Sequence, residues 1–279
     1  MGEPIFNQRV GDAWARLQEQ TDAQINPPGL AAMEKLALAP GQRVLDVGCG
    51  CGQTLLQLAD VLGPSGGVIG VDVSRPMLMQ ARTRAAGRTE IGLVLGDGQR
   101  PPFGAGGFDA LFSRFGVMFF ADARAAFASL RAALRPGGQL AFVCWQSMAR
   151  NPWAALPLRA VLPLLPDSKP PEILQPDRPG PFFFADADRV RAVLGDAGFV
   201  DVAVEPWEQP LHFGGAMTVD DAVAYCRQIG PAARASTDAP PALRPALDEA
   251  VATALAPYVS ARGVWLDGAA WLVTARAES

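Results

Sequence analysis

The sequence of 279 residues contains only four cysteines and one histidine, and these scarcities exclude several classes of protein. Cys49 and Cys51 are separated by a single residue, a spacing that offers no disulfide framework. No second Cys/His pair follows them at the spacing of a zinc site, so the sequence predicts no bound metal. We therefore expect a protein of a reducing compartment, the cytoplasm, with Cys49 and Cys51 acting as small residues in a tight turn.

Charge of one sign and long apolar runs are also missing. The chain has 24 basic and 28 acidic residues with no run of either, which argues against a nucleic-acid partner. The longest apolar stretch, residues 152–166, is interrupted by four prolines and by Arg159, so we expect no membrane span. The amino terminus carries no apolar signal core. This composition predicts a soluble globular protein and leaves a homodimer open.

Apolar segments with strand character alternate with amphipathic helical segments after residue 42. The helical segments at residues 74–87 and 122–138 each begin at a capping residue and end at glycine. Strands joined by helical crossovers predict a doubly wound α/β sheet with parallel strands. Five strands are expected in this part of the chain, at residues 43–49, 68–74, 91–97, 108–115 and 139–145.

The remainder of the chain is less regular, and we interpret it as additions to a single domain over residues 1–279. Residues 147–185 contain nine prolines and no strand pattern, which is too long for an ordinary connection. The expected parts are a helical arm (1–35), a core (36–146), a cap insertion (147–185), more core (186–210), a second cap insertion (211–262) with two helices, and a final core strand (263–279).

The stretch RVLDVGCGCGQTLLQLA, residues 43–59, places three glycines after the first expected strand. No Gly-Lys-Ser/Thr follows, so the loop is not a P-loop. A dinucleotide-binding fingerprint needs a third glycine five positions after the first, but Gln53 and Leu55 occupy those positions. Residues 44–74 contain no lysine or arginine, which favours a ligand that carries positive charge.

Two acidic residues lie at the ends of the next strands. Asp72 comes 20 residues after Gly52 and ends the second strand, where a carboxylate can accept two hydrogen bonds from a ribose diol. Asp97 and Gly98 end the third strand on the same rim of the sheet, where the acid can reach an adenine amino group. Glycines in the loop let the backbone approach such a ligand closely.

These motifs, VLDVGCGCG, VIGVDVS and LGDGQRPPF, resemble those of the class I S-adenosylmethionine-dependent methyltransferases, in particular the small-molecule enzymes of the ubiquinone and menaquinone type. The resemblance covers about residues 36–146. It implies a seven-stranded Rossmann-like sheet whose final strand, residues 269–277, is antiparallel and lies between the fifth and sixth. It also implies S-adenosyl-L-methionine as the cofactor and S-adenosyl-L-homocysteine as the product.

By this resemblance, Gly48 and Gly50 would contact the methionine part of the cofactor, and Asp72 would hold its ribose hydroxyls. Asp46 either orients the loop by accepting backbone N–H bonds or contacts the cofactor directly. Met77 either packs in the core or forms a wall for adenine. The cofactor-binding residues that the resemblance implies are Asp46, Gly48, Cys49, Gly50, Asp72, Val73, Met77, Asp97, Gly98, Ser113 and Phe115.

The methyl acceptor is expected to be an apolar or aromatic small molecule, because the arm and cap insertions offer aromatic and aliphatic side chains. Methylation on oxygen is favoured, with nitrogen and carbon open. Residues expected to bind the acceptor are Phe6, Trp14, Arg114, Trp153 and Phe183.

Candidates for a general base are few. His212, the only histidine, is the first of them, and Asp12, Asp22 and Glu208 remain open. Arg114 would bind an acidic group of the acceptor or pair with a nearby carboxylate. The arm is hypothesised to close as a lid over both ligands. Two rival interpretations are a cofactor-binding protein without catalysis and, less favoured by the glycine spacing, a nicotinamide-dependent dehydrogenase.

Overall fold

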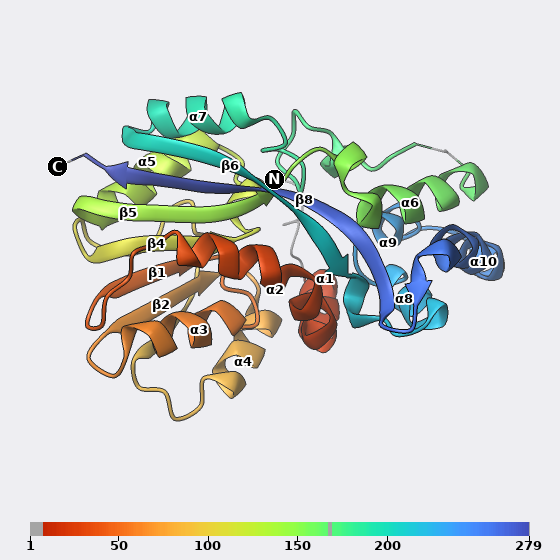
Figure 1. Ribbon diagram of the computed structural model, residues 1–279, viewed down its shortest axis with the longest axis horizontal. Coiled ribbons are helices and arrows are strands. Elements are labelled where there is room, and N and C mark those ends of the chain that lie inside the picture. Colours follow the sequence, from red (N-terminus) through yellow and green to blue (C-terminus); the bar gives the residue numbers. More distant parts are fainter. Residues whose placement is uncertain (1–7, 167–168, 279) are drawn as a thin grey trace.

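A mixed sheet forms the centre of the computed structural model, which describes residues 8–166 and 169–278 (Figure 1). The strand order is β3-β2-β1-β4-β5-β8-β6, and β8 is antiparallel to both of its neighbours. The strands are β1 (Arg43–Val47), β2 (Gly67–Asp72), β3 (Ile91–Leu95), β4 (Phe108–Arg114), β5 (Leu134–Trp145), β6 (Phe199–His212) and β8 (Gly263–Ala277); β7 (Val259–Ser260) pairs with β8 outside this order. The prediction of a seven-stranded, Rossmann-like sheet with an antiparallel final strand is confirmed.

Helices cover both faces of the sheet: α2 and α3 lie in front of it in Figure 1 and α5 lies behind. Several begin where the sequence places a capping residue, since a side-chain oxygen satisfies the free N–H groups of the first turn. Thr218 and Asp221 form the expected capping box at α8. The helices are α1 (Gln8–Arg16), α2 (Gln18–Glu34), α3 (Gln53–Leu62), α4 (Arg75–Arg84), α5 (Ala123–Ala133), α6 (Pro152–Val161), α7 (Ala187–Asp196), α8 (Val219–Cys226), α9 (Pro231–Ala235) and α10 (Arg244–Leu255).

Strands β6 and β8 extend beyond residues 200–208 and 269–277, where the sequence predicts them, and they leave the sheet together as a two-stranded ribbon. Their pairing continues to His212 and Trp265, so the strand pair enters the segment that was expected to be the second insertion. β6 contains Pro206 and Pro210, which are tolerated because β6 lies at the edge of the sheet. In Figure 1 the ribbon runs from the sheet toward α8.

A second apolar core lies beyond the carboxyl ends of the parallel strands. We use the name cap for residues 152–165 and 213–262, which include α6, α8, α9 and α10; α9 was not predicted. Trp14 and Leu17, in and just after α1, pack against the cap, whereas Met33 of α2 belongs to the main core under the sheet. The amino-terminal segment therefore contacts both units. The buried residues that form the centre of the cap core include Val161, Phe213, Ala222, Tyr225, Ile229, Leu247, Val251, Leu255 and Val264.

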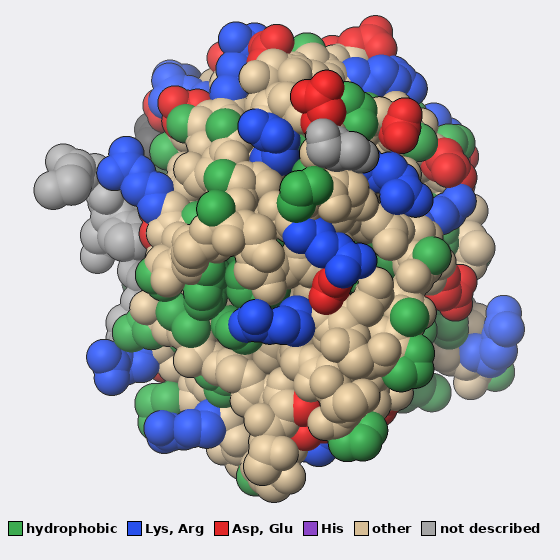
Figure 2. Space-filling view, turned by 90° about the vertical axis from the view of Figure 1, so that its left-hand side faces the viewer, with side chains coloured by type: hydrophobic (Ala, Val, Ile, Leu, Met, Phe, Trp, Pro, Cys, Tyr) green, Lys and Arg blue, Asp and Glu red, His purple; other side chains and the backbone are tan. Residues whose placement is uncertain are grey.

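Figure 2 shows the opposite end of the molecule, at the left of Figure 1, where the amino ends of the parallel strands lie. Basic and acidic side chains are both scattered over this face, with hydrophobic side chains between them. Within residues 8–166 and 169–278, no helix has the length and apolar character needed to cross a membrane.

Candidate active site

A cavity of about 1360 Å³ lies between the carboxyl ends of the strands, the first two helices and the cap. Ligands of doubly wound sheets bind at this end of the strands. The sheet contributes a rim of small and acidic residues, the middle is lined by aromatic and aliphatic side chains, and α1 and the cap contribute arginines. The rim consists of Val47, Gly48, Asp72, Val73, Met77, Asp97, Gly98, Gln99, Phe115 and Gly116.

The glycine loop after β1 is shaped for close approach. Gly48 and Gly50 have φ values of 74° and 54°, in the left-handed region that glycine adopts most readily. A Cβ added to Gly48 would lie 3.0 Å from the Cα of Gly116, and one added to Gly50 would lie 2.9 Å from the Cε of Met77. A side chain at Gly48 would therefore press on backbone, whereas one at Gly50 would have to displace the end of the Met77 side chain. This close packing and the left-handed backbone fit a cradle for the methionine part of a bound cofactor.

Asp72 holds this loop in place. One of its carboxylate oxygens accepts from the backbone N–H of Gly50 at 2.9 Å, and the other accepts from the backbone N–H of Ser74 at 2.8 Å. Each oxygen keeps a second lone pair for a ligand hydroxyl. Burial raises the pKa of Asp72, although the backbone hydrogen bonds act in the opposite direction. A buried carboxylate on the cavity rim fits the predicted ribose-binding role.

Asp46 lies beneath the loop and outside the lining of the cavity. We expected it to accept backbone N–H groups, but the structure corrects this: Asp46 accepts the hydroxyl of Thr54, and Asp72 accepts the loop N–H. The Asp46 side chain is fully buried, and this burial raises its pKa to about 7. Asp46 is therefore a packing residue whose charge is costly, and a direct contact with the cofactor has no geometric support.

Asp97 and Gly98 lie on the rim next to Asp72, as the order of the strands predicted. The Asp97 carboxylate accepts from the backbone N–H of Gln99 at 2.9 Å, which fixes its direction. A Cβ at Gly98 would lie 2.8 Å from the Cγ1 of Val47, so a larger residue would displace the rim. Val73 and Met77 also line the cavity, in positions that suit walls for an adenine ring.

Two predicted residues at the end of β4 have different positions. Ser113 does not line the cavity, and its hydroxyl donates to the Val47 carbonyl at 2.7 Å beneath the rim. The expected contact of Ser113 with the cofactor is thus replaced by a structural hydrogen bond. Phe115 does line it, with φ at 56° and its ring stacked on Trp145 at 4.0 Å between centroids. A positive φ at a bulky residue is strained and is concentrated at functional sites.

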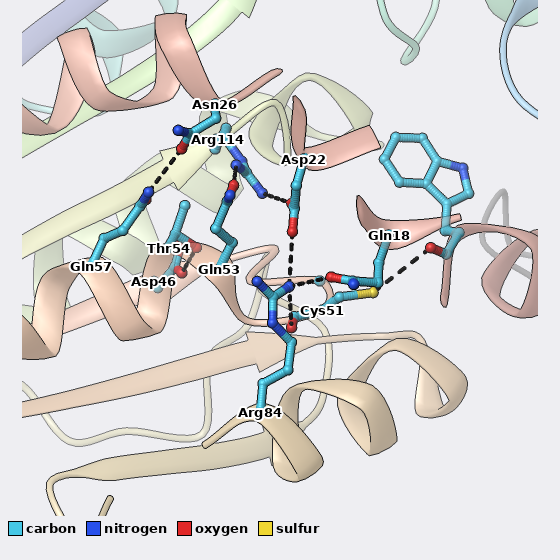
Figure 3. A network of polar contacts seen from close by, with 12 residues as sticks. Gln18, Asp22, Asn26, Asp46, Cys51, Gln53, Thr54, Gln57, Arg84 and Arg114 are labelled. Atoms are coloured by element: carbon cyan, nitrogen blue, oxygen red, sulfur yellow. Dashed lines mark hydrogen bonds and ion pairs between the residues drawn. The ribbon is translucent and has the colours of Figure 1, made fainter. Parts of the chain in front are cut away.

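A polar network fastens α2 to the glycine loop (Figure 3). The carboxylate of Asp22 lies between two arginines, 2.9 Å from Arg114 and 2.8 Å from Arg84. Arg84 also donates to the carbonyl of Cys51 at 3.2 Å, and Arg114 donates to the side chain of Gln53. Of the two roles considered for Arg114, pairing with a nearby carboxylate is the one that the geometry supports.

The residues expected to bind the acceptor are only partly brought together. Trp14, Arg114 and Trp153 line the cavity. Phe183 does not: its ring lies under the Arg189 guanidinium at 5.0 Å and against Phe184, because its segment turns toward α7. Phe6 lies outside the described residues. Cys49 and Gly50 line a small adjacent pocket of about 50 Å³.

His212 lies in the ribbon and is not among the residues that line the cavity. Its ring stacks on Trp265 at 5.1 Å, and its Nε2 lies 3.1 Å from the carbonyl oxygen of Ala216. These contacts give it a structural role, and the geometry does not support it as a base. Of the other candidates, Asp12 lines the cavity, whereas Glu208 pairs with Arg150 at 2.8 Å away from it.

Sequence reasoning missed most of the acceptor side of the cavity. Gln24 and Tyr225, together with apolar residues of α8 and α10, line it, but their spacing indicated only helices packed on a core. The described part of the chain contains no group of three or more His, Cys, Asp or Glu side chains arranged to hold a metal.

Comparisons with known proteins agree with this geometry. Residues 44–138 match the family model described as a methyltransferase domain. The chain is 34% identical over 203 residues to nocamycin O-methyltransferase of Saccharothrix syringae, which covers 69% of this chain and 72% of that protein. It is 28% identical over 192 residues to demethylmenaquinone methyltransferase of Staphylococcus aureus, covering 65% of this chain and 79% of that protein.

The fold resembles that of Haemonchus contortus phosphoethanolamine N-methyltransferase 2 in complex with S-adenosyl-L-methionine, with a TM-score of 0.59 at 19% identity over 96% of this chain and 57% of that chain. This chain combines a glycine loop without phosphate-binding features, an acid that ends β2 and an antiparallel β8. In addition, the O-methyltransferase relative matches it over most of both chains. The chain therefore belongs to the class I S-adenosylmethionine-dependent methyltransferases.

Proposed function

We propose that the enzyme transfers the methyl group of S-adenosylmethionine to an oxygen atom of an apolar or aromatic small molecule. The observation that carries this proposal is the wall of the cavity beyond the cofactor rim, where Phe119, Trp145 and Trp153 lie with aliphatic side chains. Flat aromatic walls suit a planar acceptor. The O-methyltransferase relative supports the choice of oxygen, and nitrogen and carbon remain alternatives.

The volume of the cavity supports a second ligand. Sites for drug-sized molecules measure about 300–1,000 Å³, and this cavity is larger, with room for a cofactor and an acceptor together. A protein that bound the cofactor without catalysis would need no such space beyond the methyl group.

The residues of the chain chiefly align the two reactants. When bound, S-adenosylmethionine supplies a methyl group that its sulfonium already makes electrophilic. Asp72 and Asp97 hold the adenosyl part on the rim, and the stacked rings of Phe115 and Trp145 form a rigid border toward the acceptor. Holding a nucleophile about 3 Å from the methyl carbon and excluding water supplies most of the acceleration. An acceptor that arrives ionised needs no general base.

An acceptor screen tests the proposal. Purified enzyme with S-adenosylmethionine is incubated with matched hydroxy-, amino- and unsubstituted naphthalenes, and S-adenosylhomocysteine and methylated products are measured by mass spectrometry. We expect products from hydroxylated compounds, and turnover that falls at least tenfold in Trp153→Ala. Methylation confined to the amines would contradict the choice of oxygen. A protein that binds the cofactor but methylates none of a broad set of aromatic or aliphatic acceptors would contradict the substrate class.

A further inference from the structure

The cap side of the cavity is rich in arginine, although the protein as a whole carries a net charge of −4. Against these arginines, only two carboxylates, Asp12 and Asp248, belong to the lining contributed by α1 and the cap. The arginines come from α1, from the turn after α8, from α9 and from the start of α10; they are Arg9, Arg16, Arg227, Arg234 and Arg244. In Figure 1 these cap helices lie at the opposite end of the molecule from the amino ends of the strands.

Internal pairing neutralises only part of this charge. Arg227 forms two hydrogen bonds with the Asp248 carboxylate, at 2.8 and 2.7 Å. Arg9 donates to the hydroxyl of Thr237 at 3.1 Å, a partner that carries no charge. Among the described residues, neither Arg9 nor Arg234 has a carboxylate within ion-pair distance.

Arg9 and Arg234 are also close enough to repel each other. Desolvation by the surrounding protein lowers the pKa of Arg234, and the charge of Arg9 lowers it further. Both arginines line the cavity, and the hydrogen bond of Arg9 to Thr237, two residues after α9, brings its side chain to the helix that carries Arg234. An anion bound by both guanidinium groups would relieve their repulsion. Arginine pairs with carboxylate and phosphate oxygens through parallel hydrogen bonds, which gives such a site direction as well as charge.

We propose that Arg9 and Arg234, together with Arg244, which lines the same cavity, bind an anionic group of the methyl acceptor, a carboxylate or a phosphate. This inference rests on the proposed function, because it names the substrate class for the same cavity. The acidic rim of the sheet receives the positively charged cofactor, whereas the arginines of α1 and the cap receive the negative end of the acceptor. Opposite charge at the two sides of an apolar cavity gives the acceptor one orientation, with its nucleophilic end toward the methyl group.

Arg114 does not provide this function, since Asp22 and Gln53 already occupy its guanidinium. The anion that competes for the arginines is the carboxylate of the cofactor itself. The test must therefore separate binding of the acceptor from binding of the cofactor.

Acceptor binding is measured separately from cofactor binding with three probes that share one ring system: 2-naphthoate, 2-naphthyl phosphate and the neutral 2-naphthamide. Calorimetry first measures S-adenosylhomocysteine binding, and each probe is then titrated with that product present in excess. We expect at least one anionic probe to bind tenfold or more tightly than the amide, with a preference that weakens as salt is added. The stronger of the two anions identifies the acceptor group as carboxylate or phosphate.

The preference should disappear in the double variant Arg9→Gln/Arg234→Gln and return in Arg9→Lys/Arg234→Lys, which restores the charge. Arg159→Gln, on an exposed part of α6 outside the cavity, is the matched control and should keep it. Equal binding of all three probes to the wild-type protein would overturn the inference. An unchanged preference in the double variant would do the same, as would a loss of S-adenosylhomocysteine binding in that variant. Failure of the wild-type protein to bind S-adenosylhomocysteine would instead count against the proposed function.

Discussion

Replacement of Asp72 by asparagine separates the two tasks assigned to this carboxylate. The substitution preserves shape but allows only one of the two terminal atoms to accept a hydrogen bond. The amide nitrogen must then face the N–H of Gly50 or that of Ser74, which now lie 2.9 and 2.8 Å from carboxylate oxygens. One backbone donor loses its acceptor, at a cost of about 1–3 kcal/mol.

The same change removes the charge that would hold the ribose hydroxyls. Hydrogen bonds to charged groups contribute about 1.5–3 kcal/mol, so we expect S-adenosylhomocysteine to bind roughly 10- to 150-fold more weakly. The stability of the ligand-free protein should fall much less, because burial raises the pKa of Asp72 and the variant no longer buries a charge. Affinity and stability are thus predicted to change by different amounts.

Calorimetry with S-adenosylhomocysteine and urea unfolding of the ligand-free protein measure the two quantities on the same sample. Asp60→Asn is the matched control, since Asp60 is an exposed carboxylate on α3 that pairs with Arg88. The reasoning is refuted if Asp72→Asn binds the product within twofold of the wild-type protein. A loss of affinity that merely follows a comparable loss of folding stability would refute it equally.

Three further substitutions have expected outcomes. Gly48→Ala should abolish measurable cofactor binding by calorimetry, whereas Gly63→Ala should retain it, because both glycines have positive φ but only Gly48 has a neighbouring backbone atom within 4 Å of an added Cβ. The stability of Asp46→Asn should rise relative to that of the wild-type protein between pH 5 and pH 7, by up to about 3 kcal/mol in urea unfolding. Because the pKa of Asp46 is raised in the folded state, the folded wild-type protein binds more protons than the unfolded chain in this range. The wild-type protein therefore loses stability as these protons dissociate. A difference that does not vary with pH would contradict it. Asp22→Asn should lower the free energy of unfolding by about 1–3 kcal/mol, because Arg114 keeps its charge in a largely buried position, while Asp60→Asn should change it by less than about 0.5 kcal/mol; equal effects would refute the assigned network.

The sheet and the cofactor rim were predictable because they follow from short-range patterns. Apolar strands, capped helices and glycines at the end of β1 are local features, and the carboxyl ends of parallel strands meet at one edge, so Asp72 and Asp97 had to be neighbours. Which carboxylate would accept the N–H of Gly50 was not local. Asp46 is nearer in sequence, but the loop turns toward β2 and reaches Asp72.

The acceptor side was harder to predict because it is built from segments far apart in the chain. Nothing in the sequence around Phe183 tells whether its ring enters the cavity or lies under Arg189. His212 attracted attention as the only histidine, but the length of β6 places it in the ribbon beside Trp265. Periodicity identifies the apolar face of a helix and does not identify what that face contacts.

The hydrogen-bonded ladder of β6 and β8 constrains how enzymes of this design diversify. Because the two strands enter the cap still paired, the cap is not an appendage on loose linkers, and a swing away from the sheet would have to bend a twisted double strand. Recombination that exchanges the caps of related enzymes, and with them acceptor specificity, should therefore succeed when the two crossovers fall at residues that pair with each other, such as Trp207 and Ala270. The pairing register of β6 and β8 is then preserved. Crossovers at unpartnered positions would shift one strand by a residue and turn its inward side chains outward.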